Sequence, residues 1–177
     1  MKPALSGYWL PFVHSRGRSS RCVRALVAVL LFAVAAPAVA AVTCTISAPA
    51  LAFGAYDVFA GAQITSTTTI SVTCTLTGAV NTTVPYTVSL STGLGTFVQR
   101  TMTSGVNVLN YNLYTTVART TVWGDGTGST ATVAGSLALT TAARVKTGTH
   151  TVFGAVPALQ DAKVGVYADN VTMTVTY

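Results

Sequence analysis

Side chains that could carry out catalysis are few in this sequence. It contains two histidines, His14 and His150, and its four acidic residues are all aspartates. General acid–base catalysis needs an imidazole or a carboxylate close to the reacting proton. His150 lies between Thr149 and Thr151 in a stretch that predicts a solvated strand face. No G-x-S-x-G nucleophile motif occurs. We therefore predict that the protein is not an enzyme.

A glycine-rich stretch could in principle hold an ion or a phosphate. Residues 124–128 read Gly-Asp-Gly-Thr-Gly and follow Trp123. A calcium site needs several oxygen ligands with spaced carboxylates, whereas Asp125 is the one carboxylate here. A phosphate loop needs a strand–loop–helix setting and usually a lysine. The stretch therefore predicts a turn between strands, with Trp123 in the core.

The cysteines predict a disulfide. Cys22 lies in the first part of the chain, and Cys44 and Cys74 follow as a pair. In an oxidising compartment an even pair of this kind forms a bridge. Its loop of roughly thirty residues would contribute about 3–4 kcal/mol by the chain-entropy argument. A metal site would need more ligands than two thiols and one histidine, so we expect no metal and no cofactor.

A basic segment and a short apolar segment begin the sequence. Five cations precede the apolar run 25–36, namely Lys2, Arg16, Arg18, Arg21 and Arg24. Ala38 and Ala40 then fit an A-x-A cleavage site, and the run is too short for a spanning helix. We predict a secretory signal peptide at residues 1–40, cleaved after Ala40, and one mature domain at residues 41–177.

Cleavage would also change the charge of the chain. The whole sequence carries a formal charge of +6. Residues 41–177 contain five of its basic residues and all four aspartates, and five minus four leaves +1. The basic character belongs to the leader, so nucleic acid is not an expected partner. We expect no transmembrane span in the mature chain.

Alternation of apolar and polar residues runs through most of the mature chain. It is clearest at 67–76 and in the last ten residues, 168–177, where Val171, Met173, Val175 and Tyr177 alternate with threonines. Pro85 indicates the beginning of a strand or a sheet edge. Further strands are expected at 42–47, 84–90, 97–102, 109–114, 131–134, 137–141 and 149–156, with an extended run at 51–53 and a loop at 58–66.

This succession of short strands and turns predicts an all-β fold. About seven to nine strands of this length favour an antiparallel β-sandwich. A jelly roll or a small barrel is the alternative. The last strand is apolar on one face, so it must pair within its own sheet or leave an open edge that can pair with another chain.

Several segments together resemble a known family. Residues 109–115 read Leu-Asn-Tyr-Asn-Leu-Tyr-Thr, and residues 118–126 read Ala-Arg-Thr-Thr-Val-Trp-Gly-Asp-Gly. With these, and in the same order along the chain, the sequence resembles the spore coat protein U (SCPU) domain family. Other matching segments lie at 44–48, 51–57, 70–74, 86–90, 100–102 and 165–177.

This resemblance implies a subunit of archaic, Csu-type chaperone–usher pili. Such subunits are immunoglobulin-like sandwiches that lack their last strand. A periplasmic chaperone first fills the gap, and at an outer-membrane usher a strand of the neighbouring subunit replaces it, by β-strand addition. The resemblance implies an acceptor groove lined by Val171, Met173, Val175 and Tyr177, and export to the periplasm and then to the cell surface. Some relatives are spore or cyst coat proteins, and that alternative stays open.

The segment ahead of Cys44 is short. Cleavage after Ala40 would leave residues 41–43, whereas fibre-forming relatives carry a longer alternating donor segment there. Three residues cannot fill a groove made for roughly five alternating positions. We therefore expect a tip or terminal subunit that accepts a strand, offers none, and supports adhesion and biofilm formation. A surface adhesin or other binding module is the alternative.

Overall fold

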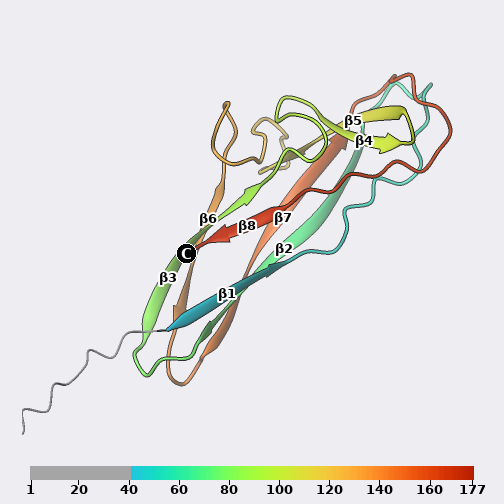
Figure 1. Ribbon diagram of the computed structural model, residues 1–177. Coiled ribbons are helices and arrows are strands. Elements are labelled where there is room, and N and C mark those ends of the chain that lie inside the picture. Colours follow the sequence, from blue (N-terminus) through green and yellow to red (C-terminus); the bar gives the residue numbers. More distant parts are fainter. Residues whose placement is uncertain (1–40) are drawn as a thin grey trace, which may run out of the picture. The chain divides into compact units, whose positions relative to one another are not determined.

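Two antiparallel β-sheets make up the part of the chain that the structure, a computed structural model, describes, residues 41–177 (Figure 1). The five-stranded sheet has the order β1-β2-β7-β5-β4, and the three-stranded sheet has the order β6-β3-β8. No helix occurs between residues 41 and 177, which confirms the all-β prediction and an immunoglobulin-like sandwich. The strands are β1 (Val42–Ser47), β2 (Ile64–Leu76), β3 (Thr82–Leu90), β4 (Arg100–Ser104), β5 (Asn107–Tyr114), β6 (Val133–Leu139), β7 (Val145–Val156) and β8 (Met173–Thr176).

Alternation places one face of each sheet in a shared core. On β2, Ile70, Val72, Cys74 and Leu76 are buried, and the residues between them are half-buried or exposed. β3 contributes Val84, Tyr86, Val88 and Leu90 from the opposite sheet. Trp123 is fully buried, as predicted, and its Nε1 donates a 3.0 Å hydrogen bond to the carbonyl of Val88.

The predicted disulfide joins β1 to β2. Cys44 and Cys74 are direct cross-strand partners with a Cα–Cα distance of 4.0 Å. Both side chains belong to the buried core. The bridge therefore fixes the register of β1, which has a strand neighbour on one side alone.

Several strand boundaries differ from the expectation. β2 begins at Ile64, inside the expected loop 58–66, and residues 51–53 belong to no strand. The two expected strands at 131–134 and 137–141 are one strand, β6. In the last ten residues, only Met173–Thr176 forms a strand with β3. β4 (Arg100–Ser104) replaces the expected strand 97–102, and β7 starts four residues earlier than expected.

His150 was expected on a solvated face, and the structure corrects this. Its side chain is half-buried on the inner side of β7, where Nε2 lies 2.9 Å from the hydroxyl of Tyr86. A Cβ on Gly135 or Gly148 would collide with the Tyr86 ring, so these two glycines make room for it. Burial lowers the pKa of His150.

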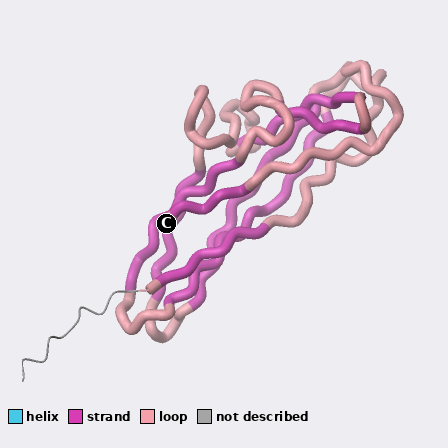
Figure 2. Tube along the Cα trace, in the orientation of Figure 1, coloured by secondary structure: helices cyan, strands magenta, loops and turns pink. Residues whose placement is uncertain are grey.

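Irregular segments gather at one end of the sandwich, away from the start of β1 (Figure 2). The predicted signal peptide, with Ala38 and Ala40, lies outside the described residues. Within 41–177 there is no helix long and apolar enough to cross a membrane. The same part of the chain holds no group of three His, Cys, Asp or Glu side chains that could bind a metal.

Candidate strand-acceptor groove

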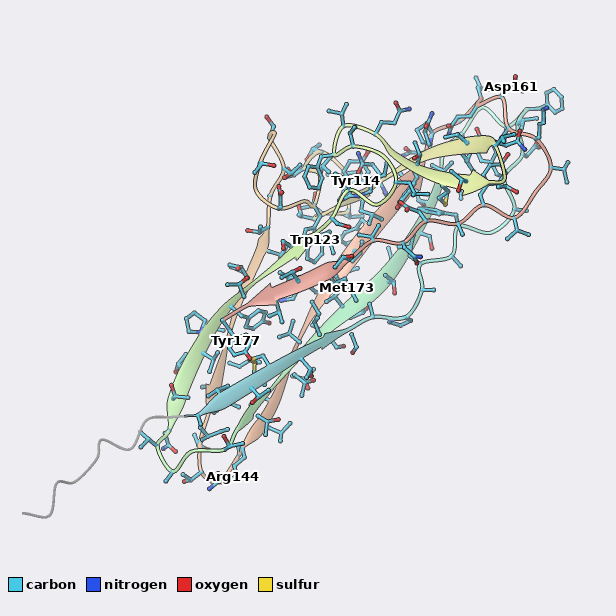
Figure 3. The ribbon with its side chains drawn as sticks, viewed as in Figure 1. Tyr114, Trp123, Arg144, Asp161, Met173 and Tyr177 are labelled. Carbon is cyan, nitrogen blue, oxygen red and sulfur yellow. A yellow bond between two sulfur atoms is a disulfide. The ribbon has the colours of Figure 1, made fainter. Side chains whose placement is uncertain are left out.

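Two sheet edges border the same side of the sandwich. β1 ends the five-stranded sheet and β8 ends the three-stranded sheet. Figure 3 shows Met173 at the start of β8 and Tyr177 just after its end, with β1 running beside the strand. Cα atoms of the two strands approach within 8 Å, yet no strand pairing joins them. Two strands that flank a third lie roughly 9.5 Å apart, so β1 and β8 would have to separate slightly to admit one.

The free edge of β8 can be assigned to particular residues. Ser91 donates its N–H to the carbonyl of Thr172 at 2.9 Å. In an antiparallel ladder the bonding residues alternate, so Thr174 and Thr176 also face β3. The backbone groups of Val171, Met173 and Val175 therefore point to the open side. The same three residues are half-buried, and their side chains pack against the core.

β1 presents a matching edge. Thr77 donates its N–H to the carbonyl of Ala41, so Thr43, Thr45 and Ser47 bond β2 in turn. The backbone groups of the alternate residues, Val42, Cys44 and Ile46, consequently face the open side. Their side chains also belong to the core or pack against it. Both edges therefore offer free peptide groups beside an apolar floor.

Beyond the paired strands the groove widens into a first chamber. It has a volume of about 520 Å³ and lies between residues 48–53 and residues 167–173. We call 48–59 the N-terminal wall and 162–173 the C-terminal wall. The floor includes core side chains from both sheets, namely Ile70, Leu90, Leu113 and Val152. The hydrophobic core is thus accessible from outside at this point.

A second chamber continues toward the end where the loops gather. It has a volume of about 720 Å³ and lies between the same two walls, over Ile64, Leu109 and Val156. The two chambers share four lining residues, Leu51, Phe53, Met102 and Tyr167, and so form one groove. Leu51 and Phe53 rest on Gly154, where a Cβ would meet both side chains at less than 3 Å.

A carboxylate ties the C-terminal wall to the floor. Asp169 Oδ2 accepts a 2.7 Å hydrogen bond from the Tyr111 hydroxyl, and Oδ1 accepts the N–H of Leu94 at 3.0 Å. Burial, together with the hydrogen bond to Asp169, raises the pKa of Tyr111 well above its ordinary value. One residue earlier, Ala168 exchanges two backbone hydrogen bonds with Thr103 of β4.

A buried guanidinium holds the strands behind this wall, a contact that no sequence pattern predicts. Arg100 is 0% exposed and donates to Asn112 Oδ1 at 2.7 Å and to the carbonyl of Trp123 at 2.8 Å. Its Nε and Nη2 both donate to the carbonyl of Ser91. Burial lowers the pKa of Arg100. Asn112, which accepts one of these hydrogen bonds, is buried as well.

The predicted groove residues do not all occupy the same environment. Val171 and Met173 line the first chamber, and Val175 of β8 packs against the core. Tyr177 is 55% exposed at the end of the chain. Whether a partner covers these four residues stays a prediction. Leu51, Phe53, Met102 and Tyr167 are groove residues that alternation in the last strand could not identify.

The fold and the groove define a class of protein: an immunoglobulin-like sandwich whose core is open between two edge strands, β1 and β8, that do not pair with each other. Residues 29–174 match the Spore Coat Protein U domain. The chain belongs to this family, which confirms the resemblance seen in the sequence. No curated protein sequence matches the chain.

Among solved structures, the chain is similar to a chain in the CsuC–CsuE complex of Acinetobacter baumannii. That structure is described as a chaperone–tip adhesion subunit pre-assembly complex from archaic chaperone–usher Csu pili. The sequence identity is 22% and the TM-score is 0.48. The alignment covers 77% of this chain and 40% of that chain.

Proposed function

We propose that this protein is an exported structural subunit of a chaperone–usher pilus and that its groove accepts a β-strand from another polypeptide. The observation that carries the proposal is the pair of free edges, β1 and β8, on either side of an opened core. An extended chain between them would bond both edges through its backbone. Its alternate side chains would fill the apolar floor.

The partners follow from this use of the groove. A periplasmic chaperone would supply the first strand, and a neighbouring pilus subunit would replace it at an outer-membrane usher. The protein would then act at the cell surface, where pili support adhesion and biofilm formation. Family membership supports this route and also leaves room for a spore or cyst coat.

A finer proposal is a tip or terminal position in the fibre. It rests on the predicted cleavage after Ala40, which would leave residues 41–43 ahead of Cys44. Such a subunit accepts a strand and has none to donate. The mass of the processed protein tests this directly, because a start well before residue 41 would restore room for a donor segment.

Exposed apolar residues could instead favour a surface adhesin. Phe59, Val164 and Val166 are 88% exposed or more. All three, however, line the second chamber. A groove that awaits a strand accounts for their exposure, so assembly is the function that the geometry supports best.

The test places a charge in the groove. A tagged full-length chain is co-expressed with the chaperone of the organism's own chaperone–usher cluster, and the complex is purified. Val175→Glu puts a carboxylate on the groove side and should abolish co-purification. Thr174→Glu is the matched control, because Thr174 is exposed on the outer side of β8. Chaperone binding that is equal for both variants, or absent for the unmodified chain, would contradict the proposal.

A further inference from the structure

The second chamber is open although its lining is largely apolar. Ile64, Leu109 and Val156 form its floor, and Phe59, Val164 and Val166 stand exposed along its walls. Apolar surfaces in water gain free energy by closing on one another, and protein interiors are normally close-packed. An open chamber of about 720 Å³ therefore needs contacts that fix the segment leading into the C-terminal wall, so that this wall does not settle onto the floor.

Tyr56 supplies one such contact from the N-terminal wall. Its hydroxyl donates to the carbonyl of Pro157 at 3.0 Å and accepts the N–H of Gln160 at 2.7 Å. Residues 157–160 connect the end of β7 to the start of the C-terminal wall. The Tyr56 hydroxyl thus ties the N-terminal wall to the 157–160 loop that leads into the C-terminal wall.

Gln160 fastens the same loop to the floor. Its Oε1 accepts the N–H of Asn110 at 2.8 Å, and its Nε2 donates to the carbonyl of Asn110 at 2.9 Å. β7 pairs with β5 at residues 112–114, so Asn110 lies beyond that ladder. The side-chain amide of Gln160 therefore bonds the Asn110 backbone in the manner of a missing strand neighbour.

The loop between these contacts is strained. Leu159 has a φ of 56°, a left-handed conformation that costs a residue with a Cβ free energy. Its side chain is 68% exposed, so packing does little to offset that cost. The hydrogen bonds of Tyr56 and Gln160 are the interactions on either side of it that hold the loop in this shape.

We propose that Tyr56 and Gln160 are positioning residues that hold the second chamber open. Without them the 157–160 loop would relax, and the C-terminal wall would fold down onto the apolar floor. The use of the chamber for a partner strand rests on the proposed function. The opening itself does not, and it can be measured without any partner.

The test uses the full-length chain purified after export and the dye 1-anilinonaphthalene-8-sulfonate, which reports accessible apolar surface. Tyr56→Phe and Gln160→Met remove the hydrogen bonds while keeping side-chain size. Each should lower dye binding measurably, since loss of hydrogen bonds of this kind shifts the ratio of open to closed chamber by about threefold to tenfold. Tyr167→Phe is the control, because its hydroxyl lines the same chamber but bonds Lys163 within one wall.

Dye binding that stays unchanged in folded Tyr56→Phe and Gln160→Met proteins would overturn the proposal. A fall of the same size in Tyr167→Phe would overturn it as well. Leu159→Gly should restore part of the dye binding to Tyr56→Phe, because glycine adopts the left-handed conformation without strain. If the variants do not fold, hydrogen exchange of the backbone amides in the unmodified protein tests the proposal. Slow exchange at Asn110 and Gln160 would support their hydrogen bonds to Gln160 and Tyr56, and fast exchange would contradict them. Loss of chaperone binding without a change in dye binding would point to the groove edges instead.

Discussion

The hydroxyl of Tyr111 on β5 donates a 2.7 Å hydrogen bond to Oδ2 of Asp169 in the C-terminal wall. The same carboxylate accepts the N–H of Leu94 at 3.0 Å and the N–H of Asn170 at 2.7 Å. Asp169 therefore joins the floor of the groove, the loop after β3 and the wall that precedes β8. The position of β8, and hence one edge of the groove, depends on this carboxylate.

Replacing Asp169 should destabilise the fold. Asp169→Ala removes all three hydrogen bonds and leaves the Tyr111 hydroxyl without its acceptor. We expect the free energy of unfolding to fall by about 2–4 kcal/mol, since bonds to a charged group contribute more than neutral ones. Denaturant unfolding measures this change. Asp161→Ala, at an exposed position, should stay within about 0.5 kcal/mol of the unmodified protein, and equal effects of the two changes would contradict this role.

The disulfide should contribute strongly to the stability of the fold, because it ties the edge strand β1 to β2. Replacing both cysteines, Cys44→Ser with Cys74→Ser, should lower the free energy of unfolding by about 3–4 kcal/mol. Reducing agent should bring the unmodified protein to the same level. An unfolding midpoint that does not respond to reduction would show that β1 is held by other contacts.

His150 should make stability depend on pH. Burial lowers its pKa in the folded state, so the unfolded chain binds more protons in the window below about pH 6.5. Stability linked to this group is present above that window and is lost as the pH falls through it. His150→Gln keeps a polar partner for Tyr86 without this titration. The stability difference between the two proteins should therefore change between about pH 7 and pH 5, and a constant difference would contradict the prediction.

Arg100 should not be replaceable by lysine. Its planar guanidinium reaches three separate acceptors, the carbonyls of Ser91 and Trp123 and the amide oxygen of Asn112. A lysine ammonium cannot reproduce that geometry. Arg100→Lys should lower the free energy of unfolding by roughly 1.5–3 kcal/mol for each hydrogen bond of the charged group that is lost. Arg119→Lys is a suitable control, and a comparable loss there would contradict the assignment.

Local alternation was enough to predict the strands that form the core. The period of two at 67–76 and 84–90 matches the buried faces of β2 and β3. Pro85 also lies at an edge, as expected, since β8 pairs with β3 at residues 87–90 and stops short of it. These features can be predicted from residues that are close in the sequence. The disulfide can be predicted from the number of cysteines.

Features that depend on distant contacts were not predictable in this way. The last strand is shorter than the alternating segment 168–177, because the backbone of Ala168 is hydrogen-bonded to Thr103 in the other sheet. Arg100 is buried because three acceptors from separate segments converge on it. His150 faces inward because Gly135 and Gly148 leave space for Tyr86. The walls of the groove likewise come from irregular segments, 48–59 and 162–173, which have no periodic signal.

Residue-resolved amide hydrogen exchange of the isotope-labelled, exported protein tests the central claim most directly. In the isolated protein, Met173 and Val175 should exchange fast while Thr174 and Thr176, bonded to β3, exchange slowly. The chaperone of the organism's own cluster should then protect Val42, Cys44 and Ile46 on β1 together with Met173 and Val175 on β8. Protection of these amides in the isolated protein, or their continued fast exchange in the complex, would show that the groove between β1 and β8 does not accept a strand.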